Sequence, residues 1–268
     1  MKSVAVHRPD TLTAHQTSVA KVIVHMKTNI SKTWDADLTL DSLSHIGCYS
    51  KSHFIDVFKS VTGISPRLFL AALRIQSAKT QLLKTSVSVT QICLDSGYSS
   101  MGTFSRIFHA LVGIPPVVFR RAATSYTSEA MLRDALEFCR ENRPDGKDVV
   151  EGYVSDETIS TGTCVIFIGA FRKQIPQGYP LAGTVLLGPG PFRLRKPTSG
   201  SYCTLAIRMP LDVAPFAPDQ NEQLLRVARS NHRPNESGLT LQLRPVDLFD
   251  PPLVIALPRL FRAKESTW

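Results

Sequence analysis

The chain has 268 residues, and its 31 Lys and Arg against 22 Asp and Glu give a formal net charge of +9 at pH 7. A hydrophobic content of 43% with 20% charged residues is ordinary for a globular protein, which excludes disorder of the whole chain and collagen-like or coiled-coil architecture. The length predicts about two domains of ordinary size.

Neither the first residues nor the apolar runs indicate a membrane segment. Residues 1–17 include His7, Arg8 and Asp10 where a signal peptide would be apolar, and no run reaches the roughly 18 apolar residues of a membrane helix. We therefore expect a cytoplasmic protein that binds no membrane. The five cysteines are scattered without a CxxC pair, so the sequence predicts neither a zinc site nor a disulfide framework.

The positive charge is concentrated in one part of the chain. Residues 18–123 contain 12 basic and five acidic side chains, a net charge of +7, whereas residues 124–268 contain 17 basic and 16 acidic side chains. Such an asymmetry is expected when one domain meets a polyanion. The first part also has helical periodicity and few prolines, whereas short apolar runs separated by Pro and Gly follow residue 143.

A duplication occupies the basic segment. At an offset of 50 residues, six positions recur as identical residues: Phe54, Phe58, Gly63, Ile64, Pro66 and Phe69 correspond to Phe104, Phe108, Gly113, Ile114, Pro116 and Phe119. Upstream of these positions the offset falls to 49, so the second copy has one additional residue just after its Tyr-Ser pair. We expect this insertion at a turn or at a helix entry.

Each copy is predicted to hold two short helices joined by a turn. The first helices are expected at 40–45 and 89–94, and the second helices are expected to begin after the caps Ser50 and Ser99. Gly47 and Gly97 lie in the turns. This plan is typical of helix-turn-helix units, at about 38–62 and 87–112. In each second helix the apolar residues share one face, which leaves the opposite face for a DNA groove.

A longer helix is predicted between the two units. Ser65 can cap it, Pro66 suits its first position, and an apolar stripe continues to about Lys84. A helix over 66–84 spans about 27 Å, and successive major-groove faces of B-DNA lie about 34 Å apart. The helix can therefore hold two reading helices in adjacent major grooves of one duplex.

Several short motifs then indicate a family. They are Gly63-Ile64-Ser65-Pro66, Leu73-Arg74-Ile75, Gly97-Tyr98-Ser99 and Phe104-Ser105-Arg106, followed by Phe108, Gly113, Pro116 and Arg120. With these motifs, residues 40–120 strongly resemble the DNA-binding domain of AraC/XylS-type transcription regulators, and residues 19–27 resemble that family's opening helix. The resemblance implies an all-α, double helix-turn-helix domain over 18–123 that binds double-stranded DNA in a sequence-specific way.

The resemblance also implies which residues read bases. They are Ser52, Ile55 and Asp56 in the first unit, and Gly102, Thr103 and Arg106 in the second. Arg106 suits this role because a guanidinium can bind guanine through two hydrogen bonds. Asp56 stands at the equivalent position, where it can accept from a cytosine amino group or repel phosphate, and the sequence leaves both open. Gly102 replaces a polar residue often seen in the family, which removes one contact.

A second group of residues is predicted to contact phosphates or to position the protein on DNA. Its members are Ser50, Lys51, His53, Lys59, Ser99, Ser100 and His109. For the two lysines and the two histidines, a merely solvated face is an equal alternative.

After the helical part we expect a connector over 124–146, with a helix from about Thr127 to Asn142, and then a β domain over 147–262. The predicted strands are 149–154, 164–171, 184–187, 192–194, 202–209, 239–248 and 253–257. About seven short strands suit an antiparallel β-sandwich. Gly188 to Leu194 with Gly200 to Tyr202 resembles prealbumin-like sandwiches of carboxypeptidase regulatory domains, a resemblance of fold alone.

No catalytic signature accompanies these domains. The sequence lacks a phosphate loop, GxSxG and HExxH, and it lacks the clustered cysteines and Pro-Cys-His motif of the DNA methyl acceptors that carry a similar helix-turn-helix. We therefore expect a non-enzymatic activator or repressor without cofactor or metal. The alternative is a β-sandwich adaptor for a ligand or protein, with a helical scaffold.

Beyond DNA, the expected partner is RNA polymerase. The commoner family order places a sensing domain before the DNA-binding domain, so the reversed order here gives no ground for a sugar-binding cupin. A small-molecule effector, self-association and contact with another protein all stay open for the β domain.

Overall fold

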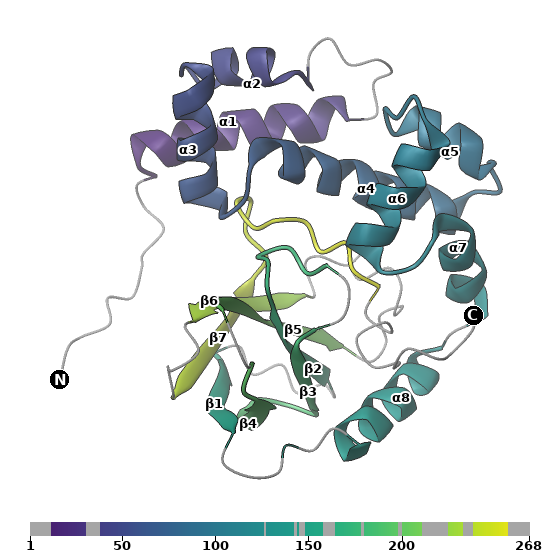
Figure 1. Cartoon of the computed structure of the whole chain (residues 1–268), viewed down its shortest axis with the longest axis vertical. Coiled ribbons are helices and arrows are strands. Elements are labelled where there is room, and N and C mark those ends of the chain that lie inside the picture. The colour runs from purple at the N-terminus through teal and green to yellow at the C-terminus, as the bar shows by residue number, and fades with distance from the viewer. Residues whose placement is uncertain are drawn as a thin grey trace.

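The computed structural model describes residues 12–30, 38–125, 127–141, 144, 148–157, 164–177, 180–197, 200–210, 225–232 and 238–256. A group of helices lies on one side of a strongly curved sheet, and one further helix flanks the sheet (Figure 1). The expected combination of a helical helix-turn-helix part and a β part is confirmed.

The helical part consists of two similar pairs around a long helix. The helices are α1 (Ala14–Asn29), α2 (Leu40–Ile46), α3 (Lys51–Thr62), α4 (Pro66–Lys84), α5 (Val89–Asp95), α6 (Met101–Val112) and α7 (Pro116–Ser125). The pairs α2–α3 and α5–α6 fall within the two predicted units, and α4 has the predicted bounds of the linker helix.

Side-chain caps explain where most of these helices begin. Thr13 and Gln16 form a reciprocal capping box at α1, and the Ser65 hydroxyl accepts the Leu68 N–H at the start of α4. Ser50 holds the predicted cap position of α3, but its side chain makes no capping hydrogen bond. The predicted cap Ser99 is wrong: Ser100 caps α6 and accepts the Thr103 N–H, because the residue inserted in the second copy lies at this helix entry.

The repeated residues form the same small core twice. Phe54, Phe58 and Phe69 pack edge to face with ring centroids 5.6 and 5.4 Å apart. Phe104, Phe108 and Phe119 form the same series of contacts at 5.7 and 5.6 Å, with the first pair tilted and the second edge to face. Gly63 and Gly113 end α3 and α6 in the left-handed conformation, with φ of 81° and 95°. The six identities are therefore the core aromatic residues and the turns that bring them together.

The second part is a seven-stranded sheet in the order β3-β2-β5-β6-β7-β1-β4. Its strands are β1 (Val149–Asp156), β2 (Cys164–Phe171), β3 (Ala182–Leu186), β4 (Gly190–Arg195), β5 (Tyr202–Pro210), β6 (Arg226–His232) and β7 (Leu239–Pro245). The two edge strands β3 and β4 contact each other, so the sheet almost closes on itself. All pairs are antiparallel, as expected, except β1 and β7, whose parallel pairing the sequence pattern did not indicate.

Two predicted β features need correction. The segment 253–256 is not a strand, and residue 257 lies outside the described residues. Strand β6 was missed because its sequence, Arg-Val-Ala-Arg-Ser-Asn-His, contains only two apolar residues. The segment at 253–256 is apolar because Leu253, Val254, Ile255 and Ala256 are buried in the core that the helices share.

One continuous core joins the helices to the sheet. Phe167 and Ile207 face outward from the curved sheet into the cluster that contains the phenylalanines of the helical part. Ile166 and Ile168 point the other way, into a separate cluster inside the curved sheet. Strand β2 is thus buried on both faces, which explains its uninterrupted apolar sequence.

Residues 246–256, here called the crossing segment, lie between the sheet and the helices (Figure 1). The Ala256 N–H donates to the Val112 carbonyl at the end of α6, at 2.9 Å. The connector helix α8 (Ser128–Glu141) packs on β3, where Phe138 lies close to Gly183. Among the described helices, none alone is both long and apolar enough to span a membrane, although α6 and 116–123 pass that test as a pair bent by 52°.

Candidate nucleic-acid interface

Helix α3 presents an exposed polar stripe opposite its aromatic core. Ser52, Asp56 and Lys59 are exposed, and Phe54 and Phe58 are fully buried on the other side of the helix. Ile55 is half-buried at the edge of the stripe. Neither the Asp56 carboxylate nor the Lys59 ammonium has a partner among the described residues. The first predicted reading helix is therefore accessible along its length.

Helix α6 presents the equivalent stripe in the second unit. Gly102, Thr103, Arg106 and His109 are exposed. The Arg106 guanidinium makes no hydrogen bond or ion pair with any described residue. Space at Gly102 is open, since an added Cβ would meet only the Ser100 hydroxyl, at 3.8 Å. Arg106 is thus a long cationic side chain available to a partner.

Two predicted phosphate-contacting residues have local partners at the start of α3. Lys51 Nζ lies 2.6 Å from Asp41 Oδ1, and both side chains are more than half exposed, so this pair contributes little to stability. The His53 ring packs edge to face on Tyr49, with centroids 5.0 Å apart, and Tyr49 Oη lies 2.7 Å from His15 Nδ1. His53 therefore belongs to an aromatic cluster at the first turn.

Contacts that the motifs did not reveal hold the second unit against the linker helix α4. Arg120 of α7 donates from Nε to the Leu82 carbonyl at 3.3 Å and from Nη2 to the Val87 carbonyl at 2.6 Å. These bonds tie the end of α4 to the start of the second unit. The resemblance had included Arg120 only as part of a motif, and its bonding partners give it a structural role.

A buried lysine, a half-buried arginine and a buried tyrosine reinforce the same region. Lys79 of α4 has no exposed surface, and its Nζ lies 5.9 Å from the centre of the Phe119 ring. Arg74 lies 5.8 Å from the Tyr98 ring centre. Burial raises the pKa of Tyr98 to about 12, against an opposing effect of the Arg74 charge. Because Lys79 is fully buried and Arg74 is half-buried, the +7 charge is not all available to DNA.

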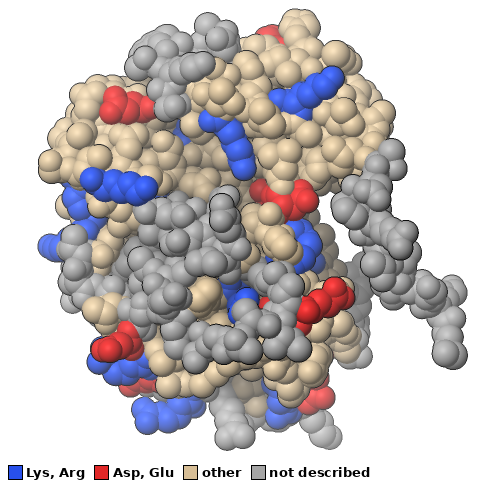
Figure 2. Space-filling model, turned by 180° about the vertical axis from the view of Figure 1, so that it is seen from behind, with Lys and Arg blue, Asp and Glu red and all other residues tan. Residues whose placement is uncertain are grey.

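Basic side chains are dispersed on one face of the molecule. On the face shown in Figure 2, Lys and Arg do not form one continuous patch, and some of them lie beside acidic side chains. Among the described residues, no group of three or more His, Cys, Asp or Glu could hold a metal ion.

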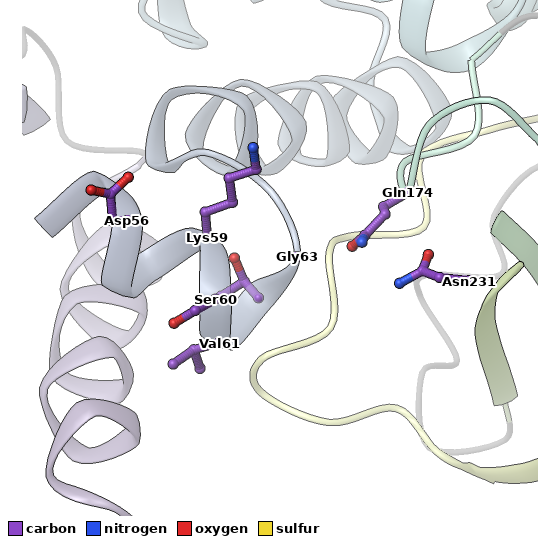
Figure 3. Close-up of a pocket in the computed structure, with 8 residues that line it drawn as sticks. Asp56, Lys59, Ser60, Val61, Gly63, Gln174 and Asn231 are labelled. Atoms are coloured by element: carbon purple, nitrogen blue, oxygen red, sulfur yellow. The ribbon is translucent and has the colours of Figure 1, made fainter. Parts of the chain in front are cut away.

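The sheet approaches the C-terminal end of α3. A hollow of about 560 Å³ lies there, and its walls come from both parts of the molecule (Figure 3). From α3 and its final turn come Asp56, Lys59, Ser60, Val61, Thr62 and Gly63, and from the sheet come Gln174 and Asn231. No motif pointed to Gln174 or Asn231, because their position depends on how the two parts dock.

Comparison with known proteins identifies the helical part. A family model described as a helix-turn-helix domain matches residues 43–122. Residues 43–122 form a helix-turn-helix domain of the AraC type. The resemblance inferred from the motifs is confirmed for this AraC-type domain, while the model match ends before the sheet. The resemblance of the sheet to prealbumin-like sandwiches stays a prediction.

Curated relatives are similar to between a third and about two fifths of the chain. An uncharacterized HTH-type transcriptional regulator of Bacillus subtilis is 31% identical over 88 residues, which are 33% of this chain and 36% of the relative. The HTH-type transcriptional activator AarP of Providencia stuartii is 27% identical over 114 residues, 42% of this chain and 82% of AarP. The chain thus spans about a third of the length of the first relatives it matches.

Solved structures resemble part of the chain. The DNA-binding domain of AdpA, in complex with a target DNA, aligns with a TM-score of 0.36 at 23% identity and covers 39% of this chain and 91% of that domain. A regulator with an AraC-type DNA-binding domain from Chromobacterium violaceum gives the same TM-score at 26% identity, over 40% of this chain and 92% of its own.

Proposed function

We propose that this chain is a sequence-specific DNA-binding transcription regulator that reads two adjacent major grooves of one duplex. The observation that carries the proposal is the pair of exposed stripes on α3 and α6, mounted on the single helix α4. From its first to its last residue, the 19-residue helix α4 spans about 27 Å, near the 34 Å between successive major-groove faces.

The roles proposed for individual residues follow from their exposure. Ser52, Ile55, Asp56, Gly102, Thr103 and Arg106 are proposed to face base edges. Lys59 and His109 are exposed further along the same helices and suit phosphate contacts. Ser50, Lys51, His53, Ser99 and Ser100 are proposed to position the helix entries on the DNA backbone.

We also propose the setting in which such a regulator works. It acts in the cytoplasm, with RNA polymerase as the partner through which it alters transcription, and without a catalytic step of its own. A small-molecule effector or a second copy of the chain is proposed to act through the sheet, because the sheet shares a core with the AraC-type domain.

Selection of bound fragments from a random DNA pool by the full chain tests this function. We expect two short conserved elements separated by about one helical turn, 10–10.5 base pairs from centre to centre. The affinity for the selected site should fall steeply with salt, because each neutralised phosphate releases counterions. No enrichment together with a flat salt dependence would contradict the proposal and favour the adaptor alternative.

A further inference from the structure

The exposed stripe of α3 leads directly to the sheet. Ser52, Asp56, Lys59 and Gly63 are spaced by four, three and four residues, so they follow one line along the helix to its final turn. An added Cβ at Gly63 would fall on the side-chain oxygen of Gln174, which therefore lies against that turn. The sheet thus supplies the next side chain on the line that is proposed to face DNA.

Gln174 is held in place by buried polar contacts. Its backbone carbonyl accepts from Arg229 Nη1 at 3.0 Å, and Arg229 Nη2 donates to the Pro251 carbonyl at 3.0 Å. Arg229 also lies beside Asp250, which accepts two hydrogen bonds from Arg244 at 2.6 and 2.8 Å. The Asp250 side chain is only 6% exposed. The loop after β2 is therefore fixed relative to the crossing segment.

The two amide side chains at the hollow have no hydrogen-bond acceptor among the described residues. Neither the Gln174 amide nor the Asn231 amide makes a side-chain hydrogen bond within the described part of the chain. Figure 3 shows both extending from the sheet side toward α3. The residues before Gln174, Arg172 and Lys173, are exposed cations, so this edge of the sheet favours an anion. Amide side chains commonly donate hydrogen bonds to DNA phosphate and sugar oxygens.

We infer that Gln174 and Asn231 bind the sugar-phosphate backbone of the DNA whose major groove α3 reads. The sheet then forms part of the DNA interface and extends it beyond the AraC-type domain. This inference rests on the proposed function, because it places the duplex along the α3 stripe. The contacts carry no base information, since they reach the backbone alone.

The test measures affinities of the full chain for the selected site and for random duplex over a range of salt concentrations. The double variant Gln174→Ala with Asn231→Ala should weaken binding to both duplexes about equally, by roughly tenfold, as expected for two lost hydrogen bonds. The slope against salt should stay unchanged, because neutral amides release no counterions. Lys59→Ala, in contrast, should lower the slope by about one.

A second pair of variants, whose side chains have the same size as the native amides, distinguishes a lost DNA contact from misfolding. Gln174→Glu with Asn231→Asp keeps the side-chain size but adds two negative charges, so binding at low salt should weaken more than in the alanine pair and recover partly as salt screens the repulsion. Thr240→Asp, on the exposed face of β7, is the control and should bind DNA almost as the unmodified chain does.

Each outcome decides the inference. Binding by the amide variants that equals that of the unmodified chain would overturn it, and tighter binding would show instead that the sheet obstructs the groove. If Arg106→Ala loses the preference for the selected site while the amide variants bind normally, the proposed function stands and the inference fails. If the unmodified chain binds no DNA, both fail.

Discussion

Asp56 and Arg106 occupy equivalent positions in α3 and α6, yet they carry opposite charges, and both are exposed without a partner among the described residues. The duplication supplies two similar helices that are proposed to read DNA, and this pair of residues makes them chemically different. The carboxylate repels phosphates unless a base donor meets it, whereas the guanidinium attracts phosphates and suits guanine. We therefore expect α6 to be the stronger reader of sequence.

Arg106→Ala tests that expectation at the residue scale. The change should cost about 1–3 kcal/mol of binding free energy on the selected site and relax the base preference at one position, because a two-hydrogen-bond contact to a base is lost. Competition binding with the selected site and with single-base variants of it measures both effects. Asp56→Ala is the matched control, since it changes the equivalent residue of α3. Equal losses on selected and random DNA would contradict a base-reading role for Arg106.

At this scale the sequence could predict the faces of the helices but not every partner. The spacing of Phe54 and Phe58 correctly indicated the buried side of α3, so the exposed residues followed. Lys79 could not be recognised as buried, because its environment consists of residues such as Phe119 that are distant in sequence. The same reason hid Gln174, whose place beside Gly63 depends on docking of the sheet.

At the scale of elements, the turns that end α3 and α6 share one backbone conformation but have different surroundings. Gly63 and Gly113 are both left-handed, which the repeat already suggested. Gly63 lies against Gln174 of the loop after β2, whereas Val112, the residue before Gly113, accepts a hydrogen bond from the Ala256 N–H of the crossing segment. The helix ends were therefore predictable from the sequence, and the contact that distinguishes them was not, because it is made by a loop more than 100 residues away.

The variants Gly63→Ala and Gly113→Ala separate the effect of the left-handed turn from the effect of the contact with Gln174. Each should lower the free energy of unfolding by about 1–2 kcal/mol, because a Cβ is strained at positive φ. Urea denaturation measures this cost. Only Gly63→Ala should also weaken DNA binding by the folded protein, since the new methyl group displaces the Gln174 amide. If the two variants lose the same DNA affinity, the contact between Gly63 and Gln174 has no part in binding.

Arg120→Ala tests the connection between α4 and the second unit. The variant loses two hydrogen bonds from a cation to the Leu82 and Val87 carbonyls, so we expect unfolding to become easier by about 1–3 kcal/mol. Arg67→Ala is the control, because Arg67 is an exposed residue near the start of α4. A shift in the urea midpoint that is no larger for Arg120→Ala than for this control would show that the two bonds contribute nothing.

At the scale of the whole molecule, the crossing segment and one face of the sheet complete the core of the helical part. Ile255 and Phe167 belong to the same buried cluster as Phe58 and Phe108. The sequence indicated a helical part and a part built of short apolar runs, with a boundary near residue 143, and both parts exist as expected. It could not show that they share a core, since the apolar run at 253–257 suits a strand as well as a buried segment. The domain boundaries themselves stay predictions.

Asp250 makes the stability of this arrangement depend on pH. Burial alone would raise the pKa of Asp250, but the hydrogen bonds from Arg244 and the Asp247 N–H and the charges of Arg244 and Arg229 lower it overall. A lowered carboxyl pKa contributes stability above the unfolded value of about 4, and this contribution is lost as the pH falls through the folded value. The free energy of unfolding should therefore decrease as the solution is acidified below about pH 4.

Asp250→Asn should reduce that acid dependence and destabilise the protein at pH 7 by about 3 kcal/mol, because it leaves the buried Arg229 without a counterion. Chemical denaturation at pH 7 and at several values below pH 4 measures both effects. Asp41→Asn, which removes an exposed pair with Lys51, should change stability by less than about 1 kcal/mol. An unchanged acid dependence in Asp250→Asn would assign that dependence to other carboxyl groups.

The bond from Ala256 to Val112 also has a consequence for the order of events during synthesis. A ribosome adds α3 and α6, the two helices proposed to face DNA, long before it adds residues 253–256, which fill the core beneath α6. Until then, apolar surface around Val112 stays open to water or to chaperones. The newly made helices therefore reach their final packing only after residue 256 has left the ribosome, so a chain truncated before residue 253 should lack the full DNA affinity.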